Sequence, residues 1–111
     1  MIYKPYSVVV VPFPFVDSIN HKRRPALVIS SEAHQKATHH ISLMMITTAK
    51  QTSWQTDYII QELNNTGLSI ESWIRQKIFT LDCRTIIKKV GELTEKDKKN
   101  IIKLLKHHIA I

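Results

Sequence analysis

The sequence predicts a mainly β (α+β) domain: a compact, strongly bent β-barrel of short strands, with one C-terminal α-helix covering an open side. Short apolar segments alternate with polar stretches along most of the chain, as in small β domains. An amphipathic helical pattern begins only near residue 94. The chain has 111 residues, enough for one domain and too few for two of ordinary size, so residues 1–111 are expected to form a single domain.

The first predicted strand, residues 8–11, is a run of four valines, and a run of β-branched residues without polar alternation is typical of a strand buried on both faces. Pro12 and Pro14 end its pairing or put it on an edge, because proline has no amide hydrogen to donate. The polar and basic residues 16–24 are expected to form a loop. Further strands are predicted at residues 26–30, 41–47, 57–61, 72–76, 77–81 and 86–93, with one helical turn at 62–67 closed by Gly67.

The predicted terminal helix begins at Thr94. Thr94 and Asp97 have the Ser/Thr-x-x-acid spacing, in which the threonine oxygen accepts a hydrogen bond from an amide of the first turn. The residues that follow recur every three or four positions and form one apolar stripe, composed of Ile101, Leu104, Leu105, His108 and Ile109. This stripe is the surface expected to cover the barrel.

Composition and charge indicate the class of partner. Sixteen Lys and Arg against nine Asp and Glu give a net charge of +7, which favours a polyanion such as nucleic acid or an acidic protein. The single cysteine, Cys83, forms no internal disulfide, so a reducing cytoplasm fits best. The longest apolar run, residues 8–16, contains two prolines and is far shorter than the roughly 20 residues that span a membrane. No secretory signal pattern begins the chain, and a cytoplasmic protein is expected.

The Arg24-Pro25 step is the first candidate for chemistry. Proline pushes the preceding residue toward an extended conformation, so the Arg24 guanidinium projects at the entrance of a strand. Its donors match the geometry of phosphate oxygens, and Lys22 and Arg23 add attraction for an anion. An ordinary basic turn is the alternative that these residues alone leave open.

The end of the third predicted strand is the second candidate, because Thr47, Thr48 and Lys50 bring two hydroxyls and a cation together. Such hydroxyls bond a phosphate or a ribose, or satisfy local backbone groups. The six histidines do not predict a metal site, since no acid or cysteine stands at a ligand-like interval from them. Trp54 and Trp73 are suited either to stacking on nucleotide bases or to packing in a core or dimer interface.

Several segments together resemble a known family. They are VVVPFPF (residues 9–15), KRRPALVIS (22–30), IT (46–47), TGL (66–68) and SWIRQKIFTLD (72–82). In this order and spacing they resemble the PemK/MazF family of toxins from type II toxin–antitoxin systems. The resemblance covers nearly the whole chain.

The resemblance implies a small SH3-like barrel with helical additions, usually a homodimer. It implies an endoribonuclease that uses no metal or other cofactor and cleaves single-stranded RNA at short sequences. The products are a 2′,3′-cyclic phosphate and a 5′-hydroxyl, and cleavage of mRNA inhibits translation and growth. An acidic antitoxin occupies the same groove and neutralises the toxin. The family's catalytic arginine and threonine fall on Arg24 and Thr47.

Three departures from the family pattern stand out. Tyr6-Ser7 replaces the usual Gly-Asp before the first strand. The aspartate that some members place shortly before the Thr-x-Asp falls on Gln76, and Arg75 is one place from their arginine. A histidine of their first loop is only loosely matched by His21. The unperturbed pKa of histidine, about 6.5, suits a general acid or base.

The expected catalytic residues are therefore Arg24, Thr47, Thr48 and His21. The expected RNA-binding residues are Lys22, Arg23, Lys50, Arg75 and Lys77. Two alternatives remain at this point: a non-enzymatic toxin of the same barrel that inhibits DNA gyrase, and a catalytically inactive nucleic-acid-binding module.

Overall fold

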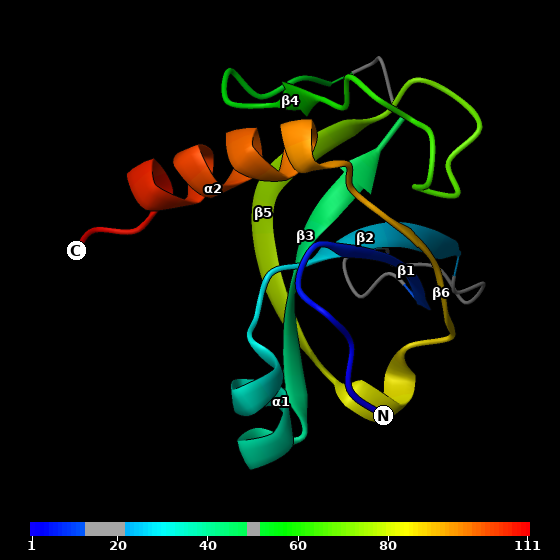
Figure 1. Cartoon of the computed structure of the whole chain (residues 1–111), viewed down its shortest axis with the longest axis vertical. Coiled ribbons are helices and arrows are strands. Elements are labelled where there is room, and N and C mark those ends of the chain that lie inside the picture. The colour runs from blue at the N-terminus through cyan, green and yellow to red at the C-terminus, as the bar shows by residue number, and fades with distance from the viewer. Residues whose placement is uncertain (13–21, 49–51) are drawn as a thin grey trace.

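The computed structural model describes residues 1–12, 22–48 and 52–111. In these ranges the chain forms six β-strands, two α-helices and one short 3₁₀ helix (Figure 1). In chain order they are β1 Ser7–Pro12, β2 Arg23–Val28, α1 Glu32–Thr38, β3 His40–Thr47, β4 Tyr58–Ile59, β5 Trp73–Asp82, η1 Cys83–Thr85, β6 Lys88–Glu92 and α2 Glu95–His108.

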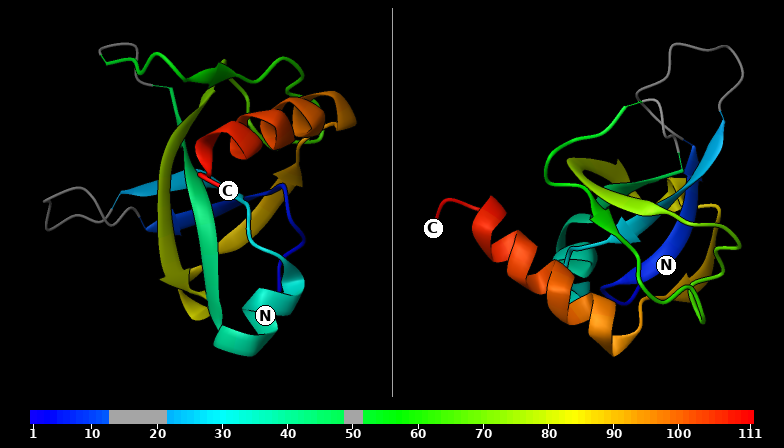
Figure 2. Two further views of the ribbon diagram at one scale, coloured as in Figure 1. Left: turned by 90° about the vertical axis from the view of Figure 1, so that its left-hand side faces the viewer. Right: turned by 90° about the horizontal axis from the view of Figure 1, so that it is seen from above.

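The strands form one curled sheet in the order β4-β5-β3-β2-β1-β6, and the neighbouring strands are antiparallel. Helix α2 crosses the sheet near β4 and β5, whereas α1 lies at the other end of the molecule (Figures 1 and 2). The predicted fold class, a mainly β barrel-like sheet with a C-terminal helix, is confirmed.

Strand β5 was predicted as two separate strands, and a local irregularity explains the division. Residues 72–81 were expected as two segments, and they form a single strand whose register against β3 shifts between Met44 and Met45. These residues pair with Ile78 and Arg75, so Gln76 and Lys77 form a bulge on β5. The bulge therefore lies at residues 76 and 77, the boundary between the two predicted strands.

Helix α1 was not predicted. Its seven residues bury only Gln35, so no apolar stripe marks it. Ser31 caps it by accepting a hydrogen bond from the His34 amide at 3.1 Å. The Gln35 side chain then binds the backbone of Tyr3 through both its oxygen and its nitrogen, each at 2.8 Å, which fixes the N-terminal segment.

Both faces of the sheet are buried, because alternate residues of the central strands enter two different apolar clusters. Val9, Val11 and Ala26 belong to the first cluster, together with residues of β3, β5 and η1. Val8 and Leu27 belong to the second, where Ile101, Leu104 and Leu105 of α2 pack against the sheet. The prediction that the valine strand is buried on both faces is confirmed, and the expected stripe of α2 ends at Leu105, since His108 and Ile109 are exposed.

A buried carboxylate attaches α2 to the segment after β4. Asp97 accepts hydrogen bonds from the Tyr58 hydroxyl at 2.5 Å and from the amides of Gln61 and Glu62 at 3.1 and 2.9 Å. Burial, reinforced by the hydrogen bond to Asp97, raises the pKa of Tyr58 to about 12. The predicted cap at Thr94 is present, because its hydroxyl accepts from the Asp97 amide.

Both glycines of the chain lie where the segment before β5 packs against β6. Gly67 has a φ of +77°, which favours glycine, and a Cβ there would lie 2.8 Å from the Val90 Cβ. A Cβ on Gly91 would overlap the backbone of Asn65 and Thr66. The segment before β5 therefore packs directly on β6, although residues 64–67 form a turn rather than the expected helical turn.

Replacing Asp97 with asparagine is expected to lower the free energy of unfolding by about 2–3 kcal/mol. The asparagine side chain would point its NH₂ group at one of the three donors that Asp97 binds, and the other two would lose a charged acceptor. Urea denaturation followed by circular dichroism measures the change. Glu95→Gln, on the exposed first turn of the same helix, is the control and should change the value by less than about 0.5 kcal/mol. Equal stability of the two variants would contradict a role for Asp97 in holding α2.

Candidate active site

The register of the sheet brings Arg24 and Thr47 to neighbouring strands. Strand β2 pairs Ala26 with Met45 and Leu27 with Met44 of β3. Two residues beyond Ala26 and Met45, toward the same end of the sheet, are Arg24 and Thr47. Side chains two residues apart share a face, and paired strands lie about 4.8 Å apart. The ladder between β2 and β3 ends at Ala26 and Met45, and beyond it Arg24 and Thr47 both lie on the face of the first cluster, at the ends of neighbouring strands.

The same row continues across two further strands. Thr47 pairs with Trp73 of β5, and Trp73 pairs with Ile59 of β4. Directly paired residues of antiparallel strands point to the same face. Arg24, Thr47, Trp73 and Ile59 thus form one transverse row over four strands.

A buried ion pair lies one row further in. Arg75 donates from Nε to Asp57 Oδ1 at 3.0 Å and from Nη2 to Oδ2 at 2.8 Å, and the two side chains are only 7% and 8% exposed. Arg75 also donates to the Thr52 carbonyl at 2.9 Å, and its guanidinium carbon lies 5.3 Å from the centre of the Trp54 ring. Asp57 accepts from the Trp54 amide at 2.9 Å. Arg75 therefore fixes the segment from Thr52 to Asp57.

The ion pair is charged near neutral pH. Burial alone would raise the pKa of Asp57, but the hydrogen bonds from Arg75 and from the Trp54 amide, together with the charge of Arg75, lower it. The hydrogen bonds to Asp57, together with its negative charge, raise the pKa of Arg75 in spite of its burial. Asp57 is consequently a weak proton acceptor, although it lies close to the row of Arg24 and Thr47.

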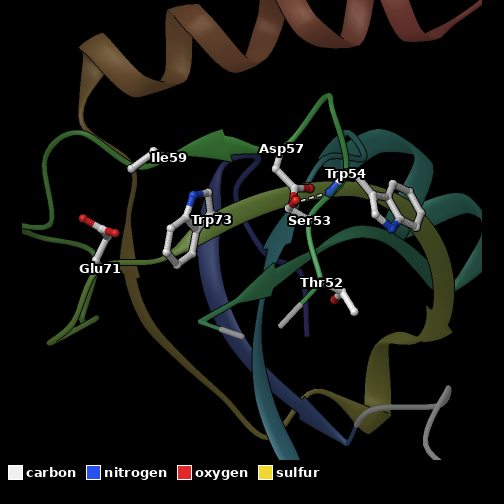
Figure 3. Close-up of a pocket in the computed structure, with 7 residues that line it drawn as sticks. All are labelled: Thr52, Ser53, Trp54, Asp57, Ile59, Glu71 and Trp73. Carbon is white, nitrogen blue, oxygen red and sulfur yellow. Dashed lines mark hydrogen bonds between the residues drawn. The ribbon is translucent and has the colours of Figure 1, made fainter. Parts of the chain in front are cut away.

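A pocket of about 490 Å³ opens beside this ion pair. It is lined by Thr52, Ser53, Trp54, Asp57, Ile59, Glu71 and Trp73. Figure 3 shows the Asp57 carboxylate between the two tryptophans, with its hydrogen bond to Trp54. No sequence signal identified this pocket, because Asp57 and Arg75 are 18 residues apart and no local motif pairs them.

The predicted site residues fall into three groups. Arg24 is half-buried beside Thr47, which is 2% exposed, while the neighbouring Lys22, Arg23 and Thr48 are exposed. Lys77 is half-buried in the bulge of β5. His21 and Lys50 lie outside the described residues.

Arg75 is placed differently from the RNA-contacting role expected for it. Its guanidinium is buried and bound to Asp57 and Thr52, so it positions a loop instead of projecting toward solvent. Gln76, the position where some relatives are expected to carry an aspartate, faces α2. Its Oε1 lies 2.8 Å from Nδ1 of His108, and its Nε2 donates to the Thr56 carbonyl at 3.4 Å.

Two findings concern other classes of site. The described residues contain no group of three His, Cys, Asp or Glu side chains that would hold a metal ion. None of the helices in the described ranges has the length and apolar character needed to cross a membrane.

Replacing Asp57 with asparagine is expected to lower the free energy of unfolding by about 3 kcal/mol at pH 7, because it leaves the buried charge of Arg75 without its partner. The folded-state pKa of Asp57 is lowered, so the stability from the pair is present at higher pH and is lost as the pH falls through that pKa. The difference between the wild type and Asp57→Asn should therefore shrink between about pH 5 and pH 2. Urea unfolding at several pH values measures it.

Glu32→Gln removes an exposed carboxylate from α1 and serves as the control, with a change below about 0.5 kcal/mol at pH 7. A deficit in Asp57→Asn that is as large at pH 2 as at pH 7 would show that the ion pair is not its source.

Comparison with known proteins places this geometry in a family. The sequence matches, over residues 4–109, the family model described as PemK-like, MazF-like toxin of type II toxin–antitoxin system. No curated protein sequence matches the chain significantly.

The solved structures that share this fold include three that cover most of this chain. An endoribonuclease in complex with its cognate antitoxin from Mycobacterial species is 16% identical, with a TM-score of 0.70, over 93% of this chain and 88% of that one. MazF from Deinococcus radiodurans is 17% identical, with a TM-score of 0.68, over 96% and 98%. The MazE–MazF structure from the same organism is 18% identical, with a TM-score of 0.64, over 86% and 84%. These identities establish the fold, and the family model, which spans almost the entire sequence, establishes the relationship: the chain belongs to the PemK-like, MazF-like toxins of type II toxin–antitoxin systems.

Proposed function

We propose that this toxin is a metal-independent endoribonuclease that cleaves single-stranded RNA at short sequences and so inhibits translation and growth. The observation that carries the proposal is the register that puts Arg24 and Thr47 on one face of the sheet, at the ends of neighbouring strands, in a member of this toxin family. An arginine next to a hydroxyl on rigid strands suits a phosphodiester and the adjacent ribose. A related fold is that of an endoribonuclease bound to its antitoxin.

The proposed reaction is an internal transesterification. The ribose 2′-hydroxyl gives up its proton as its oxygen attacks the adjacent phosphorus, the bond from phosphorus to the 5′-oxygen breaks, and that oxygen takes up a proton. The products are a 2′,3′-cyclic phosphate and a 5′-hydroxyl. Negative charge builds on the non-bridging oxygens in the transition state, where the Arg24 donors stabilise it more than in the ground state.

Thr47, with Thr48 beside it, holds the 2′-hydroxyl or the phosphate in line for attack. Positioning of a nucleophile contributes a large part of the barrier reduction by itself. Arginine stays charged in proteins and threonine is a poor base, so neither carries the proton well. His21 is the candidate for proton transfer, since Asp57 is held by Arg75.

The exposed cations near Arg24 bind the RNA backbone. Lys22 and Arg23 are exposed at the start of β2, and Lys77 and Lys50 complete the proposed set. Phosphate contacts supply affinity and make it sensitive to salt. The net charge of +7 also suits an acidic antitoxin segment, which would neutralise the toxin by covering these cations. We place the active form, a homodimer, in the cytoplasm.

Arg24→Ala is expected to lower the rate of RNA cleavage by about 10²–10³, the usual loss for one donor aimed at transition-state charge. The measurement is single-turnover cleavage of a mixed-sequence single-stranded RNA in excess chelator, with the ends of the products identified. Lys36→Ala removes one exposed positive charge from α1, at the other end of the molecule, and is the matched control. It should cleave at the wild-type rate.

Three outcomes would refute this assignment. They are cleavage by Arg24→Ala at the wild-type rate, cleavage of RNA that carries a 2′-deoxyribose at the scissile position, and loss of activity in the chelator. Intact RNA with inhibited DNA gyrase would favour the non-enzymatic alternative.

A further inference from the structure

Both tryptophans of the chain line the same pocket. The sequence contains two, Trp54 and Trp73, and they lie on either side of the Asp57 carboxylate in the pocket of about 490 Å³ (Figure 3). Trp54 is 42% exposed, which is unusual for a large apolar side chain with a core available to it. Because both rings border an open pocket, they are available to a ligand or to a partner chain as well as to the core.

The side chains that line the pocket do not suit an RNA phosphate, but they suit an RNA base. The described residues that line it include no lysine, arginine or histidine, so they offer a phosphate no positive charge. The pocket offers two aromatic rings, the hydroxyls of Thr52 and Ser53, and the Glu71 carboxylate. Aromatic rings stack with unpaired bases, and a carboxylate accepts hydrogen bonds from the amino group of a base.

Glu71 is the polar group available to a ligand. Asp57 is occupied by Arg75 and the Trp54 amide, whereas Glu71 is exposed and has no hydrogen-bond or ion-pair partner among the described residues. Uracil presents a carboxylate only its ring N3–H, which lies between two carbonyl oxygens, whereas adenine, cytosine and guanine each present an amino group. Glu71 is therefore suited to a base that carries an amino group.

The pocket is rigid before any ligand arrives. Arg75 lies against the Trp54 ring and binds Asp57. Asp57 in turn accepts a hydrogen bond from the Trp54 amide, so both ends of the segment from Trp54 to Asp57 are held. Trp73 belongs to β5, where it pairs with Thr47. A preorganised pocket loses less entropy when it binds a base.

The position of the pocket relates it to the proposed cleavage site. Trp73 follows Arg24 and Thr47 in the transverse row, two strands away from Arg24, which is about 10 Å at the usual strand spacing. A base close to the scissile phosphate is therefore within reach of Trp73 while the phosphate contacts Arg24.

We propose that the pocket lined by Trp54, Trp73 and Glu71 binds one unstacked base of the RNA against the Trp73 ring, with Glu71 selecting a base that carries an amino group over uracil. This inference rests on the proposed function for its ligand, single-stranded RNA. It adds a site of sequence selection that is separate from the cations that bind the backbone.

Tryptophan fluorescence tests the inference directly, because all of the signal comes from this pocket. The probes are 2′-O-methyl hexamers of A, C and U, which lack the attacking hydroxyl and stay intact. We expect saturable quenching by the A and C hexamers, with affinities about tenfold higher than for the U hexamer. Hexaglutamate, as an acidic peptide, should not quench, because Asp57 and Glu71 repel it.

Glu71→Ala should bring the affinities for the three hexamers to within about twofold of one another. Glu95→Ala, an exposed acid on α2, is the control and keeps the preference. Trp73→Ala should weaken binding of the A hexamer about 5- to 100-fold, whereas Trp73→Phe, which retains a stacking ring and the packing of β5, should stay within about threefold of the wild type.

Cleavage of unmodified RNA, measured in parallel, separates the two proposals. Cleavage without quenching, or an unchanged preference in Glu71→Ala, would overturn the base pocket and leave the nuclease assignment intact. Quenching with the expected preference but no cleavage would refute the nuclease and support the pocket. Quenching by hexaglutamate and not by the hexamers would assign the pocket to a protein ligand and overturn the inference.

Discussion

The pairing of β3 with β2 on one side and β5 on the other is the constraint on which the candidate site depends. β3 contributes Leu43, Met44 and Ile46 to the two cores, and all three are at most 1% exposed. A slip of one residue would turn each of them to the wrong face of the sheet, so the register is strongly determined by packing. That register sets Trp73 of β5 beside Thr47 and puts Arg24 of β2 on the same face of the sheet. The apolar core therefore fixes the geometry of the polar groups above it.

The two arginines of this region show how burial decides what a cation does. Arg75 is paired through two hydrogen bonds with Asp57 inside the protein, and breaking such a pair is costly because a buried charge is left behind. It therefore stabilises the loop that holds Trp54. Arg24 lies at the mouth of the sheet, beside the exposed Lys22 and Arg23. In the proposed RNA complex, the solvent-facing cations would bind the backbone and the aromatic walls of the pocket would bind a base, each on its own surface.

The sequence predicted the elements that have a strong local signal. The valine strand, the Thr94 cap and the apolar residues of α2 through Leu105 were found because periodicity and capping are local properties. Helix α1 was missed because it is held by Gln35 and a serine cap rather than by an apolar stripe. Of the candidate site, Arg24 and Thr47 were identified from sequence, but Arg75 was expected to contact RNA. Its partner Asp57 is 18 residues away, and only the pairing of β4 with β5 brings the two together.

The arrangement of carboxylates bears on how a nuclease of this kind would move protons. A general base must be free to accept a proton, and a carboxylate whose pKa is lowered by a guanidinium accepts one poorly. Asp57 is in that state, and position 76, where the family resemblance leads to an aspartate in some members, is turned by the β5 bulge toward His108 of α2. A carboxylate at position 76 would therefore bind His108 instead of approaching Arg24. In the proposed reaction, the described part of the site would orient the RNA and stabilise charge on phosphorus, so its contribution to the rate would come from positioning and electrostatics.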